Sequence, residues 1–154
     1  MQHVFWVYPG QLAGRPGPGV APWDLRAVRD NGIDLVLSLA SDLFPHSDAL
    51  QANLRRVCIP FPDVVPPDPL CVSLCRSSLA MAFTVATQAM SAGDTVLVHC
   101  AGGYDRTGLL LARCIVDREG LSGEAAIGRV RAIRPYALSA EGWEKMAITL
   151  LSEC

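Results

Sequence analysis

The chain has 154 residues, of which 51% are hydrophobic and 18% charged, and its formal net charge is -2. This length and composition suit a single globular domain that needs no metal or disulfide to fold, and they exclude an intrinsically disordered chain. Because no run of Lys or Arg stands out, nucleic acid and anionic membrane surfaces are not expected as partners.

Several local features of the sequence indicate where the protein is located and whether it binds a metal. Residues 1–10 lack the charged and apolar regions of a signal peptide, and no apolar stretch is expected to reach the roughly 18 residues of a membrane span. The six cysteines have apolar surroundings and are expected to be reduced thiols. Cys71 and Cys75 have no second ligand pair downstream, so no zinc site is expected there. The sequence thus predicts a cytoplasmic monomer with no metal or cofactor and no membrane association.

Hydrophobic patterning and turn residues predict that strands and helices alternate along the chain. Strands are expected at residues 4–8, 33–39, 54–59 and 95–98. Helices are expected at residues 22–31, 70–92, 107–118, 122–133 and 141–151, with a further short helix after Pro45. Pro22 is expected in a first turn, and Ser122 and Ser139 as helix N-caps.

Two segments are predicted to be loops. Residues 9–19 are rich in turn residues, and residues 60–69 contain five prolines, which neither a helix nor a central strand tolerates. The fold predicted for residues 1–154 is a single α/β domain. Its central, mainly parallel sheet of four or five strands is flanked by helices.

The segment VHCAGGYDRTGLL places a cysteine directly after the last predicted strand and an arginine six residues later. In an open α/β sheet, ligands bind beyond the carboxyl ends of the strands. Gly102 and Gly103 allow successive backbone N–H groups to point at one anion, and Arg106 offers a fork for two phosphate oxygens. The same field favours the thiolate form of Cys100. Together these features predict a nucleophile directed at phosphorus.

A cysteine before a glycine-rich turn can also be purely structural. The strand before this loop, the helix after it, His99 before the cysteine and Thr107–Gly108 after the arginine favour the catalytic interpretation.

HCAGGYDRTG resembles the signature loop of the cysteine-dependent protein tyrosine and dual-specificity phosphatases, His-Cys-x5-Arg-Ser/Thr-Gly. The segments FWVYPGQLAG, LVLSLASDLFPHSD, IPFPDVVPPDP and RAIRPYALS also resemble those of compact, atypical members. The resemblance implies an α/β phosphatase domain with this loop between the last strand and a helix.

The resemblance also implies roles for single residues. Cys100 would form a phosphocysteine intermediate, Arg106 would bind the phosphoryl oxygens, and Thr107 would help the thiolate leave. His99 would orient the loop by hydrogen bonds. The remaining positions implied to bind the phosphorylated substrate are Ala101, Gly102, Gly103, Tyr104 and Asp105.

Three carboxylates are candidates for the general acid that protonates the leaving group. Asp63 matches the position of the acid in compact relatives and is preferred. Asp105 lies inside the loop, where some bacterial tyrosine phosphatases and myotubularin lipid phosphatases also have Asp before Arg. Asp68 is the third candidate, or else it caps the helix that follows. The alternative for Asp105 is that it faces outward and pairs with a base.

The predicted substrates are phosphorylated proteins or peptides, with phosphotyrosine and also phosphoserine and phosphothreonine accepted because so short a domain implies a shallow pocket. Tyr104 would stack on a substrate ring at the rim or pack against residues 45–48. The alternatives are a phosphoinositide phosphatase, a non-catalytic phosphate-binding module and a rhodanese-like sulfurtransferase. Cys58, at the end of a neighbouring strand, is either a buried thiol or a disulfide partner of Cys100.

Overall fold

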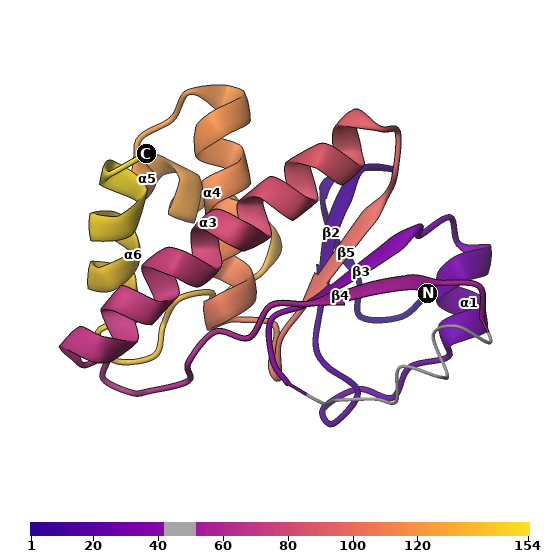
Figure 1. The fold of residues 1–154 in the computed structure, drawn as a ribbon, viewed down its shortest axis with the longest axis horizontal. Coiled ribbons are helices and arrows are strands. Elements are labelled where there is room, and N and C mark those ends of the chain that lie inside the picture. Colours follow the sequence, from indigo (N-terminus) through magenta and orange to yellow (C-terminus); the bar gives the residue numbers. More distant parts are fainter. Residues whose placement is uncertain (42–51) are drawn as a thin grey trace.

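A computed structural model describes residues 1–41 and 52–154, so the short helix predicted after Pro45 lies outside the described residues. Five strands form one sheet in the order β1-β2-β5-β3-β4 (Figure 1). The strands are β1 (Phe5–Tyr8), β2 (Leu12–Arg15), β3 (Leu35–Ser38), β4 (Arg55–Cys58) and β5 (Val96–His99). Only the β1–β2 pair is antiparallel within this sheet, so the prediction of a mainly parallel sheet is confirmed.

The segment predicted as turns, residues 9–19, contains strand β2, and that part of the prediction is wrong. A tight turn, in which the Gln11 N–H donates to the Tyr8 carbonyl at 2.9 Å, folds β2 back on β1. Strand β2 is short and is buried on both faces between β1 and β5, so it lacks the apolar–polar alternation that would reveal it. Gly14 belongs there because a Cβ atom would collide with the ring of Phe5.

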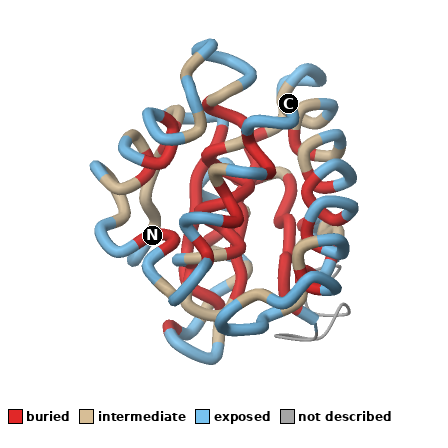
Figure 2. Tube along the Cα trace, turned by 90° about the vertical axis from the view of Figure 1, so that its left-hand side faces the viewer, coloured by how far each residue is buried: buried red, intermediate tan, exposed pale blue. Residues whose placement is uncertain are grey.

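Helices cover both faces of the sheet (Figure 1). Helix α1 (Leu25–Asp30) lies on one face; the other face is covered by α3 (Pro69–Ser91), α4 (Asp105–Glu119), α5 (Gly123–Ile133) and α6 (Trp143–Ser152). Successive strand residues alternate between the two resulting cores: Val36 and Leu97 belong to the smaller one with α1, whereas Leu37 and Val98 belong to the larger one. Figure 2 shows these buried strands enclosed by helices whose outer sides are exposed.

The helix ends agree with the predictions in part. Ser122 caps α5 by accepting a hydrogen bond from the Ala125 N–H at 3.2 Å, as expected. Asp24 caps α1, so Pro22 precedes the helix and does not occupy its first turn. Ser139 is not the cap of α6, because an additional turn follows it and the helix begins after Gly142.

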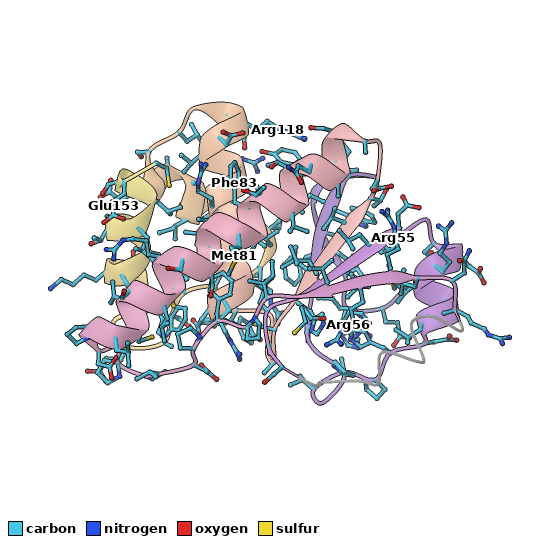
Figure 3. All side chains as sticks on the ribbon, in the orientation of Figure 1. Arg55, Arg56, Met81, Phe83, Arg118 and Glu153 are labelled. Atoms are coloured by element: carbon cyan, nitrogen blue, oxygen red, sulfur yellow. The ribbon has the colours of Figure 1, made fainter. Side chains whose placement is uncertain are left out.

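Helix α3 corrects the expectation that no segment is long and apolar enough to cross a membrane. Its 23 residues meet that requirement in length and composition, although core helices of globular proteins meet it too. One side of α3 packs into the larger core through Cys75, Leu79 and Ala82, while Met81, labelled in Figure 3, is exposed. Helix α3 is therefore a core helix of this domain.

Candidate active site

The carboxyl ends of the parallel strands meet at one edge of the sheet. Arg15 of β2 and Ser38 of β3 lie in register with His99 of β5, and Cys58 of β4 is in register with Ser38. The residue after His99 is Cys100, so the cysteine leaves the sheet at this edge. The predicted position of the cysteine-containing loop, between the last strand and a helix, is thereby confirmed.

The cysteine loop, residues 100–106, connects β5 to α4. Cys100 is only 2% exposed, and its Sγ accepts a hydrogen bond from the Thr107 hydroxyl at 3.2 Å. Gly103 adopts a left-handed conformation (φ 73°), and a Cβ atom there would lie 3.0 Å from the Arg15 carbonyl oxygen. Helix α4 begins at Asp105, two residues earlier than predicted, so its amino end belongs to the loop.

Five successive carbonyl groups of the cysteine loop, those of residues 100–104, each accept a hydrogen bond. In the order of the accepting carbonyls, the donors are His99 Nδ1, the Gly17 N–H, Arg134 Nη2, Arg134 Nε and the Gly108 N–H, at 3.1, 2.8, 2.7, 3.3 and 3.1 Å. The last of these carbonyls, that of Tyr104, also accepts from the Leu138 N–H at 3.3 Å. In a trans peptide the N–H points opposite to the C=O. The N–H groups of residues 101–106 have no acceptor in the described parts of the chain, so they are available to one bound anion.

A chain of hydrogen bonds runs from β4 to the cysteine loop. Arg56, labelled in Figure 3, donates Nε–H to Ser38 Oγ at 2.9 Å, and Ser38 lies 2.6 Å from His99 Nε2. Because His99 Nδ1 faces the Cys100 carbonyl, Nδ1 carries the proton and Nε2 accepts from Ser38. Burial is the main cause that lowers the pKa of His99 to about 4; the Cys100 carbonyl opposes this shift and the nearby arginines contribute to it. His99 is thus a neutral ring that holds the loop.

Arg106 and Asp63 meet across the site. Arg106 Nη2 donates to Asp63 Oδ2 at 3.2 Å; the arginine side chain is 9% exposed and the aspartate side chain 57%. The proline-rich loop spans residues 60–68, since Pro69 already begins α3, and a hydrogen bond from Trp143 Nε1 to the Val64 carbonyl at 3.1 Å anchors it to α6. The contact between Arg106 and Asp63 joins segments 43 residues apart and brings the preferred acid next to the arginine.

The other two carboxylates have different partners. Asp68 caps α3, since its Oδ1 accepts from the Cys71 N–H at 2.7 Å. Asp105 Oδ1 accepts from the Ala140 N–H at 3.4 Å, so it turns toward the segment before α6, and no ion pair of Asp105 is found among the described residues. Burial raises the pKa of Asp105; Asp63 adds to the increase, while the Ala140 N–H and Arg106 oppose it. Because its pKa is raised, Asp105 remains a candidate for the general acid.

Arg134 contacts the cysteine loop although no role was assigned to it from the sequence. It follows α5, donates to two loop carbonyls and stacks on the Tyr104 ring, with its guanidinium carbon 3.9 Å from the ring centre. Tyr104 is 38% exposed at the rim, and the alternative packing against residues 45–48 lies outside the described residues. The arginine–proline pair at residues 134–135 was the available sequence signal. It could not reveal the contact, since 28 residues separate it from Arg106.

Neither interpretation of Cys58 agrees with the structure, since Cys58 is exposed and is not a buried thiol. Strand β3 lies between β4 and β5, so Cys58 at the end of β4 is two strand spacings, about 9.6 Å, from β5, the strand that Cys100 follows. A disulfide needs Cα atoms within about 7 Å, which rules out the Cys58–Cys100 pair in this fold. Burial, together with a smaller effect of Cys71, raises the pKa of Cys75 to about 12. No cluster of three His, Cys, Asp or Glu side chains suited to a metal occurs in residues 1–41 and 52–154.

The chain belongs to the dual specificity phosphatase family, whose model of the catalytic domain matches residues 23–148. It is 31% identical over 143 residues to dual specificity protein phosphatase 12 of Mus musculus, covering 92% of this chain and 39% of that protein. It is 27% identical over 111 residues to the tyrosine-protein phosphatase CDC14 of Saccharomyces cerevisiae, covering 72% of this chain and 19% of that protein. The chain therefore spans well under half the length of these relatives.

A solved structure shares the fold over nearly its whole length. Tk-PTP in its active form superimposes with a TM-score of 0.82 at 22% identity, covering 99% of each chain. This likeness and the five-stranded sheet confirm the predicted α/β phosphatase fold.

Proposed function

We propose that this protein hydrolyses phosphate monoesters of proteins through a phosphocysteine intermediate. One observation carries the proposal. The buried Cys100 thiol, paired with the Thr107 hydroxyl, lies in a loop whose N–H groups at residues 101–106 have no acceptor within the described chain. Membership of the dual specificity phosphatase family supports the same conclusion.

In the first step the Cys100 thiolate attacks phosphorus. The S–P bond forms, the bond from phosphorus to the ester oxygen breaks, and protonated Asp63 gives its proton to that oxygen. The loop N–H groups and the Arg106 guanidinium bind the other phosphoryl oxygens, where the charge of the transition state is spread. The Asp63–Arg106 contact supports this assignment, because it holds the carboxyl group beside the guanidinium while leaving it exposed enough to turn toward the substrate.

In the second step water replaces the sulfur. Asp63, now a carboxylate, takes one proton from the attacking water, the S–P bond breaks and inorganic phosphate leaves. Negative charge returns to the sulfur at this point. The Thr107 hydroxyl, 3.2 Å from Cys100 Sγ, donates to the sulfur and so stabilises the departing thiolate.

We infer phosphoproteins as the substrate class from the character of the rim. None of the loop residues 101–105 is basic, and Arg134, which lies behind the loop, is occupied by loop carbonyls. Exposed apolar or aromatic side chains near the site include Val64, Val65 and Tyr104, and the exposed charged side chain beside them is the acidic Asp63. Such a rim suits the side chains of a peptide better than a polyanionic inositol headgroup. The cytoplasmic location and the monomeric state stay predictions from the sequence.

Phosphate release tests the activity directly. The wild type should release phosphate from an aryl phosphate, a phosphotyrosine peptide and a phosphoserine peptide, and mass spectrometry of an acid-quenched reaction should find phosphate on Cys100. Cys100→Ser should abolish turnover. Cys154→Ser is the matched control, since Cys154 is exposed at the end of the chain and should retain full activity.

Three results would contradict the proposal. Full activity of Cys100→Ser would exclude the nucleophile, and release of thiocyanate from thiosulfate and cyanide without any phosphatase activity would point to a sulfurtransferase. Faster turnover of a phosphoinositide in mixed micelles than of either peptide would overturn the substrate class.

A further inference from the structure

The cysteine loop can bind an anion only while its peptide groups keep their orientation. Each outward carbonyl fixes the inward direction of the next N–H, so the hydrogen bonds that the carbonyls of residues 100–104 accept set the orientation of the whole loop. A peptide that flipped would place a carbonyl oxygen against the phosphoryl group, where its partial negative charge repels the anion.

The five carbonyls are not held in equivalent ways. Those of Cys100, Ala101 and Tyr104 are bound by a buried histidine or by backbone N–H groups, which have little freedom. Those of Gly102 and Gly103 are bound by the single side chain of Arg134. The only long side chain among these donors therefore orients the two peptides of the loop that follow glycines.

Glycine makes these two peptides the easiest to rotate. Gly103 already has a positive φ of 73°, and neither Gly102 nor Gly103 has a Cβ atom that would restrict the flanking torsions. The requirement for an external restraint is thus greatest where Arg134 binds.

The contacts of Arg134 are those of a rigid fork. Nη2 lies 2.7 Å from the Gly102 oxygen and Nε lies 3.3 Å from the Gly103 oxygen, so one planar group binds two successive carbonyls. The guanidinium carbon lies 3.9 Å from the centre of the Tyr104 ring and 5.1 Å from that of the Phe5 ring in β1. These rings restrict the plane of the guanidinium and so the direction of its donors.

We propose that Arg134 is a positioning residue that keeps the N–H groups of Gly103 and Tyr104 directed at the phosphoryl oxygens. It touches no reacting atom and acts through the loop carbonyls. The inference rests on the proposed function for its catalytic consequence, but its effect on anion binding does not require turnover.

The experiment compares Arg134→Ala, Arg134→Lys and Arg129→Ala. Arg129 is the matched control, because it lies on α5 and pairs with Glu119 at the surface. Tungstate affinity is measured by calorimetry in the Cys100→Ser background, kcat/KM is measured on an aryl phosphate, and Tm is measured without anion. Arg134→Ala should lower both tungstate affinity and kcat/KM by about 10- to 100-fold, the loss expected for removing hydrogen bonds from a charged donor. Arg129→Ala should change neither.

Arg134→Lys separates orientation from charge. Lysine keeps the positive charge but lacks the planar fork, so it should recover only part of the loss. Full recovery would overturn the proposal, since charge alone would then explain the effect. Unchanged tungstate affinity in Arg134→Ala would also overturn it, even with a lower Tm, because the arginine would then only join α5 to the loop. If Arg134→Ala does not fold, Arg134→Gln and Arg134→Lys supply the same comparison. A wild type that binds tungstate but hydrolyses no phosphate ester contradicts the proposed function and leaves this test intact.

Discussion

The assignment of the general acid can be tested by replacing Asp63 with asparagine. Asparagine has nearly the same shape, and its amide oxygen can still accept the hydrogen bond from Arg106 that the carboxylate accepts at 3.2 Å. Asp63 is 57% exposed, and an ion pair of this kind contributes less than about 1 kcal/mol to stability. Asp63→Asn should therefore fold normally, and any large change in rate reports on proton transfer.

The size of the rate loss should depend on the leaving group. A general acid contributes about 10²- to 10⁴-fold to the rate when the departing oxygen is strongly basic. Asp63→Asn should thus lower kcat on an alkyl phosphate or a phosphoserine peptide by that amount. It should have a much smaller effect on p-nitrophenyl phosphate, whose leaving group is stable without a proton. The assay is steady-state kinetics on both substrates across pH.

Asp105→Asn and Asp68→Asn complete the comparison. Burial raises the pKa of Asp105, which makes it the strongest competitor, whereas Asp68 is occupied as the cap of α3. Full kcat of Asp63→Asn on the alkyl phosphate, together with a loss in Asp105→Asn, would refute the assignment and transfer the role to Asp105.

Three further predictions concern stability and the second chemical step. The pKa of His99 is about 4 in the folded protein and 6.5 in the unfolded chain, so the unfolded chain binds more protons between these two pH values. Protonation of His99 should therefore lower the free energy of unfolding by about 3 kcal/mol as the pH falls from 6.5 to 4. In urea unfolding, the free energy of unfolding of His99→Gln should decrease less over this pH range than that of the wild type. Asp68→Ala should lose about 1 kcal/mol of unfolding free energy with unchanged kcat/KM, and a fall in kcat would instead mean that Asp68 takes part in catalysis. Thr107→Val should lower kcat about tenfold and make phosphocysteine accumulate in rapid-quench experiments, while Thr107→Ser should restore turnover; no accumulation in the valine variant would argue against a role in the second step.

Local signals account for most of the confirmed predictions. The position of Cys100 after a buried strand, and the presence of a long helix at the other end of the cysteine loop, follow from hydrophobic patterning over adjacent residues, although α4 begins at Asp105 and not after Arg106. Strand β2 was missed because its four residues carry no such pattern, and Ser139 was mistaken for a cap because a serine before a helical segment does not reveal an intervening turn.

The sequence by itself determined the chemistry of the cysteine loop, because its thiol, glycines and guanidinium lie within seven consecutive residues whose spacing the backbone alone sets. Only the tertiary structure decided what surrounds that loop. The order of the strands places Ser38 beside His99 and places Cys58 too far from Cys100 to form a disulfide. The proline-rich loop places Asp63 beside Arg106, and the end of α5 places Arg134 against the glycine carbonyls. These contacts join segments tens of residues apart. They depend on how helices and strands pack against one another, and no local pattern of residues encodes that packing.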